Sequence, residues 1–272
     1  MLILLLKTLA RLPLVVLQGL GAVAGVVLYL LPGRYRQRLQ ANAGQAGYHQ
    51  PGFGLRAAAH AGMQALETAW AWFRPHDAVA RVQIPQRELL DTIYGQQRPI
   101  LFLTPHIGNF ELAARVAARH APFHVLYRPP RRPALRRVVE TCRDRDGVRI
   151  APANRHGLKQ MLQALKQGEQ VGILPDQVPA EREGAWADLF GRPAYTVTLP
   201  GRLAQDPQVL VVATSCTRLP WGRGWVLYLE PITDRPDATP EAQAAWVNQI
   251  MMRLIRRCPE QYLWSYHRYK NP

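Results

Sequence analysis

The stretch Pro99–Glu111, PILFLTPHIGNFE, decides how this chain is organised. Its first half is an apolar run that is typical of a buried strand, and the run ends at a proline followed at once by His106. Gly108 then allows the chain to turn, and Asn109 can cap a helix whose first turn would hold Glu111. The stretch therefore predicts a strand, a tight turn and a helix, with a histidine and a carboxylate at the strand tip.

Strand-like and helix-like segments alternate along the rest of the chain. We expect helices at 56–73, 110–120, 157–167, 197–204 and 240–257, and strands at 123–127, 171–174, 209–214 and 225–229. Residues 184–195 look like a loop, and the alternating aromatic residues of 262–266 are interpreted as a last strand. This order indicates an α/β fold, a sheet covered by helical layers. The helix at 56–73, which is rich in alanine and ends in tryptophans, fits either a core position or the headgroup level of a membrane.

Leu12–Leu31 is an uncharged stretch of 20 residues near the amino terminus. At about 1.5 Å per residue it is long enough to cross a hydrocarbon core of about 30 Å. A cleaved signal peptide is the competing interpretation, but Pro32-Gly33-Arg34 lacks the small-residue cleavage pattern. We therefore expect a membrane anchor in residues 1–38 and a catalytic domain in 39–272. The basic residues after the stretch, Arg34, Arg36 and Arg38, outnumber those before it. By the positive-inside tendency they predict a catalytic domain in the cytoplasm.

The composition indicates an acidic partner and a reducing compartment. Lys and Arg outnumber Asp and Glu by 34 to 19, a formal charge of +15. Nucleic acid, anionic lipid and an acidic carrier protein all fit such a balance. Cys142, Cys216 and Cys258 are far apart and odd in number, so neither a disulfide framework nor a zinc site is expected.

His106 and Glu111 are the residues that we expect to carry chemistry. In a continuous helix, residues five apart lie about 140° around the axis, so the pair can meet only if the chain turns at Gly108. A carboxylate on one imidazole nitrogen fixes the tautomer and leaves the other nitrogen to take a proton from a hydroxyl. The pattern therefore predicts general-base activation of an alcohol.

Covalent and metal-dependent routes find little support in the sequence. Ser215 and Ser265 are the only serines, and neither lies in a Gly-x-Ser-x-Gly elbow. Cys142 lies among arginines but has no base paired with it, and no second histidine stands at ligand spacing from His106. Direct attack by a substrate hydroxyl, without a metal, is the mechanism that remains.

Five ordered blocks of sequence show a resemblance to a known family. His106-x4-Glu111 resembles the His-x4-Asp/Glu motif of the glycerolipid acyltransferase superfamily. The other four blocks are Val125–Arg128 (VLYR), Leu174–Gln177 (LPDQ), Phe190–Ala194 (FGRPA) and Pro259–Lys270 (PEQYLWSYHRYK). Together they resemble the lipid A biosynthesis late acyltransferases, the lauroyl and myristoyl acyltransferases. The resemblance implies a mixed β-sheet flanked by helices, behind an N-terminal transmembrane helix.

The resemblance also implies an activity and its partners. A fatty acyl chain would pass from acyl carrier protein, or sometimes from acyl-CoA, to a hydroxyl of an acylated, phosphorylated glucosamine disaccharide. The enzyme would be a single-pass protein of the cell inner membrane with its catalytic domain on the cytoplasmic face. It would need no cofactor and would bind no nucleic acid.

The same resemblance assigns roles to individual residues. His106 would be the general base and Glu111 its partner. Arg128 would bind a phosphate or the developing oxyanion, and the other expected substrate-binding residues are Gly108, Asn109, Asp176 and Gln177.

Several alternatives stay open at this point. Arg128 fits a surface ion pair as well, and Asp176 fits a helix cap or a loop. The acceptor could be a lysophospholipid or another glycolipid. The chain could also be a membrane-tethered protein that binds acidic lipid without chemistry, which would be favoured if His106 and Glu111 lay apart and faced a closed core.

Overall fold

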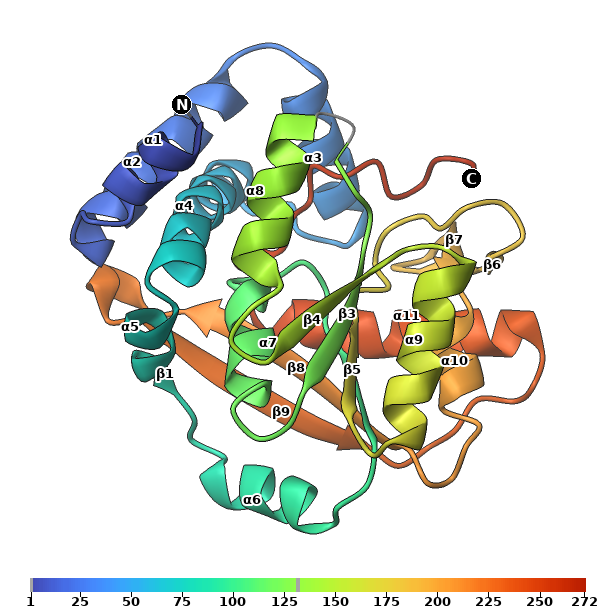
Figure 1. Cartoon of the computed structure of the whole chain (residues 1–272). Coiled ribbons are helices and arrows are strands. Elements are labelled where there is room, and N and C mark those ends of the chain that lie inside the picture. The colour runs from blue at the N-terminus through green and yellow to red at the C-terminus, as the bar shows by residue number, and fades with distance from the viewer. Residues whose placement is uncertain (1, 131–132) are drawn as a thin grey trace.

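A seven-stranded sheet forms the centre of the computed structural model, which describes residues 2–130 and 133–272 (Figure 1). β8 and β9 pair antiparallel and the other neighbouring strands pair parallel, so the sheet is mixed, as expected. The spatial order is β1 (Val82–Gln83), β9 (Trp225–Ile232), β8 (Leu210–Arg218), β2 (Ile100–Leu103), β5 (Gln170–Ile173), β3 (Phe123–Tyr127) and β4 (Val148–Pro152).

β2 lies at the middle of this sheet, and all four of its residues are buried. Leu101 and Leu103 belong to the hydrophobic cluster on one face, whereas Ile100 and Phe102 belong to the cluster on the other. A parallel strand that is covered on both faces needs apolar residues at every position, which explains the continuous apolar run in the sequence.

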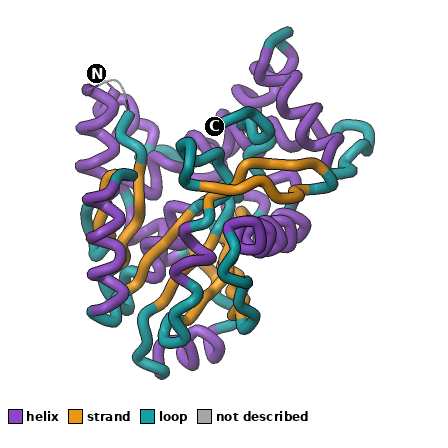
Figure 2. The backbone as a smooth tube through the Cα atoms, turned by 90° about the vertical axis from the view of Figure 1, so that its right-hand side faces the viewer, coloured by secondary structure: helices purple, strands orange, loops and turns teal. Residues whose placement is uncertain are grey.

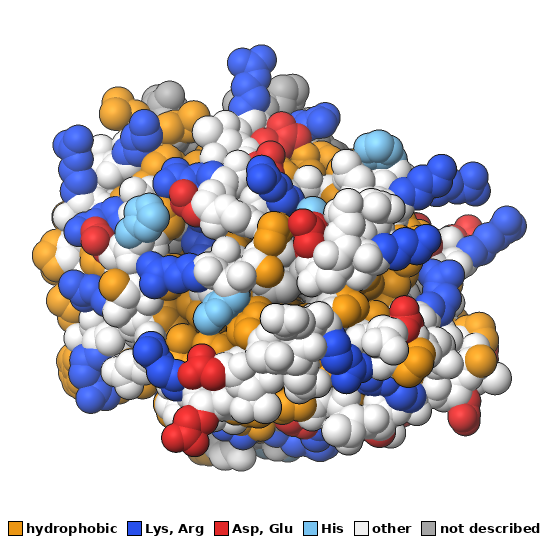
Figure 3. Space-filling model, turned by 60° about the horizontal axis from the view of Figure 1, so that its bottom comes forward, with side chains coloured by type: hydrophobic (Ala, Val, Ile, Leu, Met, Phe, Trp, Pro, Cys, Tyr) orange, Lys and Arg blue, Asp and Glu red, His pale blue; other side chains and the backbone are white. Residues whose placement is uncertain are grey.

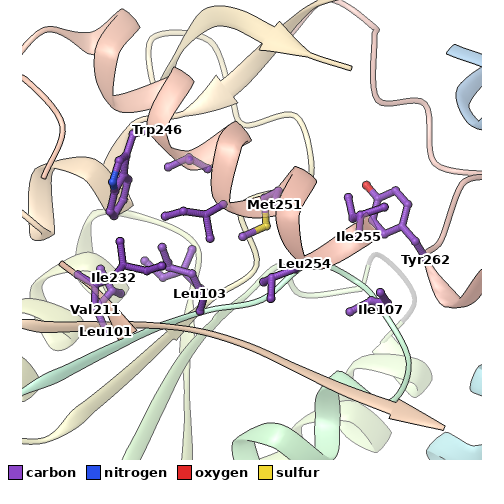
Figure 4. Close-up of a cluster of buried hydrophobic side chains, with 14 of the residues drawn as sticks. Leu101, Leu103, Ile107, Val211, Ile232, Trp246, Met251, Leu254, Ile255 and Tyr262 are labelled. Atoms are coloured by element: carbon purple, nitrogen blue, oxygen red, sulfur yellow. The ribbon is translucent and has the colours of Figure 1, made fainter. Parts of the chain in front are cut away.

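Helices cover both faces of the sheet. The cluster that contains Leu101 and Leu103 packs against α9 (Arg155–Lys166), α10 (Leu199–Leu203) and α11 (Pro240–Arg257). Figure 4 shows Met251 and Leu254 of α11 lying over the strand residues of this cluster. The cluster on the other face packs against α5 (Pro75–Ala80), α6 (Arg87–Gly95), α7 (Phe110–Ala117) and α8 (Pro133–Arg143).

The alanine-rich helix expected at 56–73 is α4 (Phe53–Phe73), and it is a core helix. Ala57 and Ala58 at its start belong to one hydrophobic cluster, and Trp70 and Trp72 at its end belong to the other. α4 therefore joins both halves of the core, and its tryptophans are buried in the protein.

The apolar N-terminal segment forms two helices, α1 (Leu2–Leu9) and α2 (Leu14–Leu30). Among the described residues, no single helix is long and apolar enough to cross a membrane; the pair formed by α1 and α2 is, but it is bent by 120°. The expectation of one membrane span over Leu12–Leu31 is therefore not confirmed. α3 (Arg34–Gln45) follows directly.

One face of α2 is packed tightly on α4. A Cβ on Gly21 would come within 2.6 Å of the carbonyl oxygen of Gly62, so small residues allow the two backbones to approach. Gln18 of α2 donates a hydrogen bond of 2.6 Å to the buried carboxylate of Glu67. The opposite face of α2 is exposed and apolar, and includes Val15, Val16, Leu20, Val23, Val27, Leu28 and Leu30.

Residues 184–195, expected to be a loop, form most of a β-hairpin, so this prediction was wrong. β6 (Gly184–Leu189) and β7 (Arg192–Val197) pair antiparallel in a second sheet (Figure 2). Phe190 and Gly191 both take positive φ angles, of 54° and 77°, which closes the tight turn between the strands. Mixed polar and apolar residues hid the hairpin, because neither strand contains a long apolar run.

Residues 262–266, after α11, were expected to form a last strand, and this prediction was also wrong. The tail forms a short 3-10 helix, η2 (Pro259–Gln261), and residues 262–266 belong to the irregular segment that follows it. Tyr262 makes an isolated bridge with Ile107, and both Tyr262 and Trp264 are buried in the core (Figure 4 shows Tyr262). The alternating aromatic residues reflect this packing against the loop that carries His106.

Candidate active site

The loop between β2 and α7 carries His106, and main-chain hydrogen bonds hold it on three sides. Its partners are β5, β8 and the tail after α11. The bonds run from Thr104 N to Ile173 O (3.2 Å), from Gly108 N to Gln261 O (3.1 Å), from Asn109 N to Cys216 O (2.7 Å) and from Leu263 N to His106 O (3.1 Å). The backbone of His106 is thus fixed by segments that are far apart in the sequence.

Gly108 makes the turn that the sequence predicted. Its φ angle is +54°, a conformation that residues with a Cβ rarely adopt. A Cβ at this position would overlap the carbonyl oxygen of Cys216 in β8. Both constraints require glycine, and they let the loop pass close to the neighbouring strand before α7 begins.

The imidazole of His106 is paired with Asp176. The Nδ1 atom lies 2.7 Å from Asp176 Oδ1, and the backbone N–H of His106 donates to Asp176 Oδ2 at 3.0 Å. The Asp176 side chain is 4% exposed and that of His106 is 19% exposed. With Nδ1–H donating to the carboxylate, Nε2 is left as the basic nitrogen.

The register of the sheet explains this pairing. β2 and β5 run parallel with Leu103 opposite Ile173, and His106 and Asp176 each follow three residues later, directly after a proline. The carboxyl ends of adjacent parallel strands lie at the same edge of the sheet, so the two tips meet there. The sequence showed both strand tips, but not that the strands are neighbours.

Glu111 lies in the first turn of α7, as predicted, but it does not hold the imidazole. Its carboxylate accepts two hydrogen bonds from Arg143 of α8, one of them from Nε at 2.7 Å. The predicted contact between His106 and Glu111 is therefore wrong, because Arg143 occupies the carboxylate and Asp176 occupies Nδ1. Glu111 still lines the same cavity as His106, and a role for it in the reaction stays a prediction.

The electrostatics of Asp176 fit a carboxylate that stays ionised. Burial raises the pKa of the carboxyl, but the charge of His106, its two hydrogen bonds and the charge of Arg268 outweigh burial and hold the pKa below its usual value. A buried anion beside an imidazole stabilises the imidazolium that forms when the ring takes a proton.

The other residues expected at the site lie around this pair. The amide nitrogen of Gln177 lies 3.3 Å from His106 Nε2 and can donate to it. Asn109 stands at the N-cap position of α7 but makes no side-chain capping bond, and its buried amide nitrogen has no partner among the described residues. Arg128 follows β3 and is exposed at the edge of the cavity.

A cavity of about 500 Å³ opens beside His106. Its polar lining at the carboxyl ends of the strands includes Glu111, Arg128, Arg143 and Gln177. Its apolar lining runs along the strands toward α6 and includes Phe102, Phe123, Val125, Leu227, Leu229 and Leu90. His106 and Glu111 therefore face an open cavity, not a closed core.

Figure 3 shows that Lys and Arg side chains are spread over one face of the molecule, with hydrophobic side chains visible between them.

Three residues that hold or line the site were not among those predicted from the sequence. Arg143 pairs with Glu111, the carbonyl oxygen of Gln261 accepts from the His106 loop, and Tyr266 contacts the segment after β5. Tyr266 accepts a hydrogen bond of 3.0 Å from the backbone of Val178, just after Asp176 and Gln177. These contacts join residues that are far apart in the chain, so no local pattern reveals them.

Comparisons with known proteins show which family this sequence resembles. A family model described as bacterial lipid A biosynthesis acyltransferase matches residues 56–271. The lipid A biosynthesis lauroyltransferase of Escherichia coli K12 is 32% identical over 216 residues, which cover 77% of this chain and 69% of that protein. The palmitoleoyltransferase of the same strain is 28% identical over 211 residues, covering 77% and 68%, and its myristoyltransferase is 26% identical over 196 residues, covering 70% and 59%.

Proposed function

The chain belongs to the bacterial lipid A biosynthesis acyltransferase family, and we propose that it moves a fatty acyl chain from acyl carrier protein to a hydroxyl of a lipid A precursor. As a member of this family it is an O-acyltransferase. The observation that carries the proposal is the pairing of His106 with Asp176 beside a cavity with apolar walls. It supplies a base with a fixed tautomer next to a space suited to a hydrocarbon chain.

The proposed reaction is a direct transfer without an acyl-enzyme. His106 Nε2 takes the proton of the acceptor hydroxyl as its oxygen attacks the thioester carbonyl, and Asp176 stabilises the resulting imidazolium. The tetrahedral intermediate then collapses, the C–S bond breaks, and the imidazolium returns the proton to the leaving thiolate. An ester and a free thiol result, so atoms and charges balance without a cofactor.

Arg128, at the edge of the cavity, can stabilise the oxyanion of this intermediate. The buried amide nitrogen of Asn109 lies outside the cavity lining, so it is not assigned this role. Donors that are already in place act without reorganisation at the moment of reaction. The Glu111–Arg143 pair lies at the same edge and would position the donor or the acceptor.

The net charge of the chain and its exposed apolar surface support the proposed partners. A net charge of +15 favours an acidic carrier protein and a phosphorylated lipid, and the exposed apolar face of α2 fits attachment to the inner membrane from the cytoplasmic side. A binding protein without chemistry was tied to two conditions, that His106 and Glu111 lie apart and that they face a closed core. The two side chains have other partners and do not pair, which meets the first condition. Both face an open cavity, and His106 is paired with Asp176 instead, so the second condition is not met and catalysis is favoured.

Replacing the base and its partner tests the proposal. We expect His106→Ala and Asp176→Asn each to lower kcat by roughly 10²–10⁴, because a positioned general base contributes about that much. We expect Glu111→Gln to act mainly on KM, since its carboxylate holds Arg143 and not the imidazole. The measurement is transfer of a labelled acyl chain from acyl carrier protein to a purified lipid A precursor.

Circular dichroism of the same preparations shows whether each variant is folded. Full activity of His106→Ala would overturn the mechanism, and a loss with Glu111→Gln but not with Asp176→Asn would restore Glu111 as the partner of the base. Mass spectrometry of lipid A from cells with and without the protein tests the acceptor. An unchanged profile would favour a lysophospholipid or another glycolipid.

A further inference from the structure

A second cavity, of about 450 Å³, opens on His106 and is lined by a different part of the chain. His106 and Gln177 line both cavities, so the imidazole lies between them. The remaining residues of the second cavity come from α3, from the loop after β5 and from the tail, and they are Arg38, Asp176, Leu263, Ser265, Tyr266, His267 and Lys270.

The second cavity is positively charged. Arg38 and Lys270 line it, and neither has an ion-pair partner within the described ranges. Its one acidic member, Asp176, is buried and already bonded to His106. The cavity thus contains two basic side chains without carboxylate partners in the described part of the chain, together with hydroxyl and imidazole side chains. These are the hydrogen-bond donors that a phosphate group requires.

The backbone of the helix that carries Arg38 and the start of the tail are held together by the fold. Asn42 of α3 donates hydrogen bonds of 2.6 and 2.7 Å to the carbonyl oxygens of Trp264 and Tyr266, which fastens the tail to the helix. Arg38 lies four residues before Asn42 and so on the same face of α3, toward the tail. The wall of the second cavity is therefore held in place before any ligand arrives.

We infer that the second cavity binds a phosphate group of the acceptor lipid through Arg38 and Lys270, while the apolar cavity receives the acyl chain of the donor. The two substrates would then reach His106 from different sides, with the acceptor hydroxyl held near Nε2. This inference rests on the proposed function and adds to it the residues that select the acceptor.

The place of Arg38 next to the apolar N-terminal helices supports a lipid as the source of the phosphate. α3 begins four residues after the end of α2, whose last residues expose apolar side chains. A basic helix that follows an exposed apolar helix is typical of a surface that contacts lipid headgroups. A phosphate on a membrane lipid can therefore reach Arg38 without leaving the bilayer surface.

The test uses Arg38→Gln, Lys270→Gln and the double variant of the full chain. Lys159→Gln is the matched control, because Lys159 is exposed on α9 and lines neither cavity. KM for the acceptor is measured with a phosphorylated precursor and with the same precursor after enzymatic removal of its phosphate groups. We expect the double variant to raise KM for the phosphorylated acceptor roughly tenfold, the effect of about one charged hydrogen bond.

KM for the dephosphorylated acceptor and KM for the acyl carrier protein donor should stay within about twofold, and Lys159→Gln should behave as the wild type. Arg38→Lys, which keeps the charge, should recover part of the affinity. An unchanged acceptor KM in the double variant would overturn the inference. An increase in KM for the donor alone would also overturn the inference, because it would place the phosphate of the carrier's prosthetic group in this cavity.

A binding measurement separates this inference from the proposed function. His106→Ala cannot use the proposed base, so the affinity of phosphorylated acceptor can be measured in this background with and without the double substitution. A tenfold loss of affinity there would support the phosphate site even if transfer failed. If the wild type binds the acceptor but transfers nothing to it, the proposed function is wrong; if the double substitution leaves affinity unchanged, the site is wrong.

Discussion

Two carboxylates lie near His106, and each has a different partner. Asp176 is almost fully buried, fixes the imidazole with a side-chain and a main-chain hydrogen bond, and faces the second cavity. Glu111 accepts from Arg143 and faces the first. Asp176 prepares the imidazole of His106 to accept a proton. The Glu111–Arg143 pair leaves the imidazole free and can orient the reacting molecules in the first cavity.

His60 provides a prediction at the scale of one residue. It accepts a hydrogen bond of 2.9 Å from Arg218, whose guanidinium pairs with the fully buried Glu67. Burial, together with the charge of Arg218, lowers the pKa of His60 from 6.5 to about 4. The ring is therefore neutral in the folded protein at pH values where it is protonated in the unfolded chain.

Because the unfolded state binds the extra proton, stability should fall as the pH drops from about 6.5 to 4, by up to about 3 kcal/mol from this group. His60→Gln removes the titration and keeps an acceptor for Arg218. We expect the free energy of unfolding, measured with urea at pH 7 and pH 4.5, to fall less in this variant than in the wild type. Equal pH dependence in the two proteins would contradict the assignment.

At the scale of elements, periodicity and apolar runs in the sequence placed α4, α7, α9, α10 and α11 and the strands β2, β3, β5, β8 and β9, whereas α3, α5, α6, α8, β1 and β4 were not predicted. Phe123–Tyr127 and Pro240–Arg257 were predicted at the bounds that they have, because each has a clear apolar pattern and a proline or polar boundary. The hairpin of β6 and β7 was missed, since it depends on cross-strand contacts such as that between Trp186 and Tyr195.

The site could be predicted only in part, because one part of it is local in the sequence and the other depends on contacts between distant segments. His106, Gly108 and the helix after them form one local unit, and a local pattern found them. The pairing of His106 with Asp176 depends on β2 and β5 being neighbours across 70 residues of chain, and the pairing of Glu111 with Arg143 depends on how α7 and α8 pack. Neither adjacency leaves a trace in the local sequence.

The contact between α2 and α4 can be tested with glycine substitutions. A Cβ at Gly25 would overlap the carbonyl oxygen of Ala58, whereas a Cβ at Gly19 meets nothing within 4 Å. We expect Gly25→Ala to destabilise the protein by about 1–3 kcal/mol, the usual cost of overpacking. Gly19→Ala should be neutral or slightly stabilising, because alanine favours helix.

Thermal unfolding in detergent, followed by circular dichroism, measures both variants. Equal melting temperatures for Gly25→Ala and Gly19→Ala would show that α2 does not depend on this close approach.

For the whole molecule, the exposed apolar face of α2 and the basic residues that flank it define a surface suited to anionic lipid. Val23 is 63% exposed and Val27 is 52% exposed on this face. Lys7, Arg11, Arg34 and Arg36 lie before and after it in the chain. Apolar contact and attraction to anionic headgroups both contribute to binding at such an interface.

Val23→Asp with Val27→Asp should weaken association with vesicles of anionic phospholipid at least tenfold, since two carboxylates replace apolar surface that is buried in the bound state and are repelled by the anionic headgroups. Neither side chain packs in the core, so unfolding should be little affected. Leu162→Asp, at a residue of α9 that is 41% exposed, is the matched control. Co-sedimentation with vesicles gives the comparison, and equal binding by all three proteins would place the membrane contact elsewhere.

The hydrogen bonds between the His106 loop and residues 261–263 have a consequence for biosynthesis. The ribosome makes the loop more than 150 residues before it makes the segment that fixes it. During translation the loop therefore lacks two of its four anchoring main-chain bonds until residues 261–263 dock. Catalytic competence has to wait for that docking, and a molecule released before this segment is made would hold its base in an unfinished site.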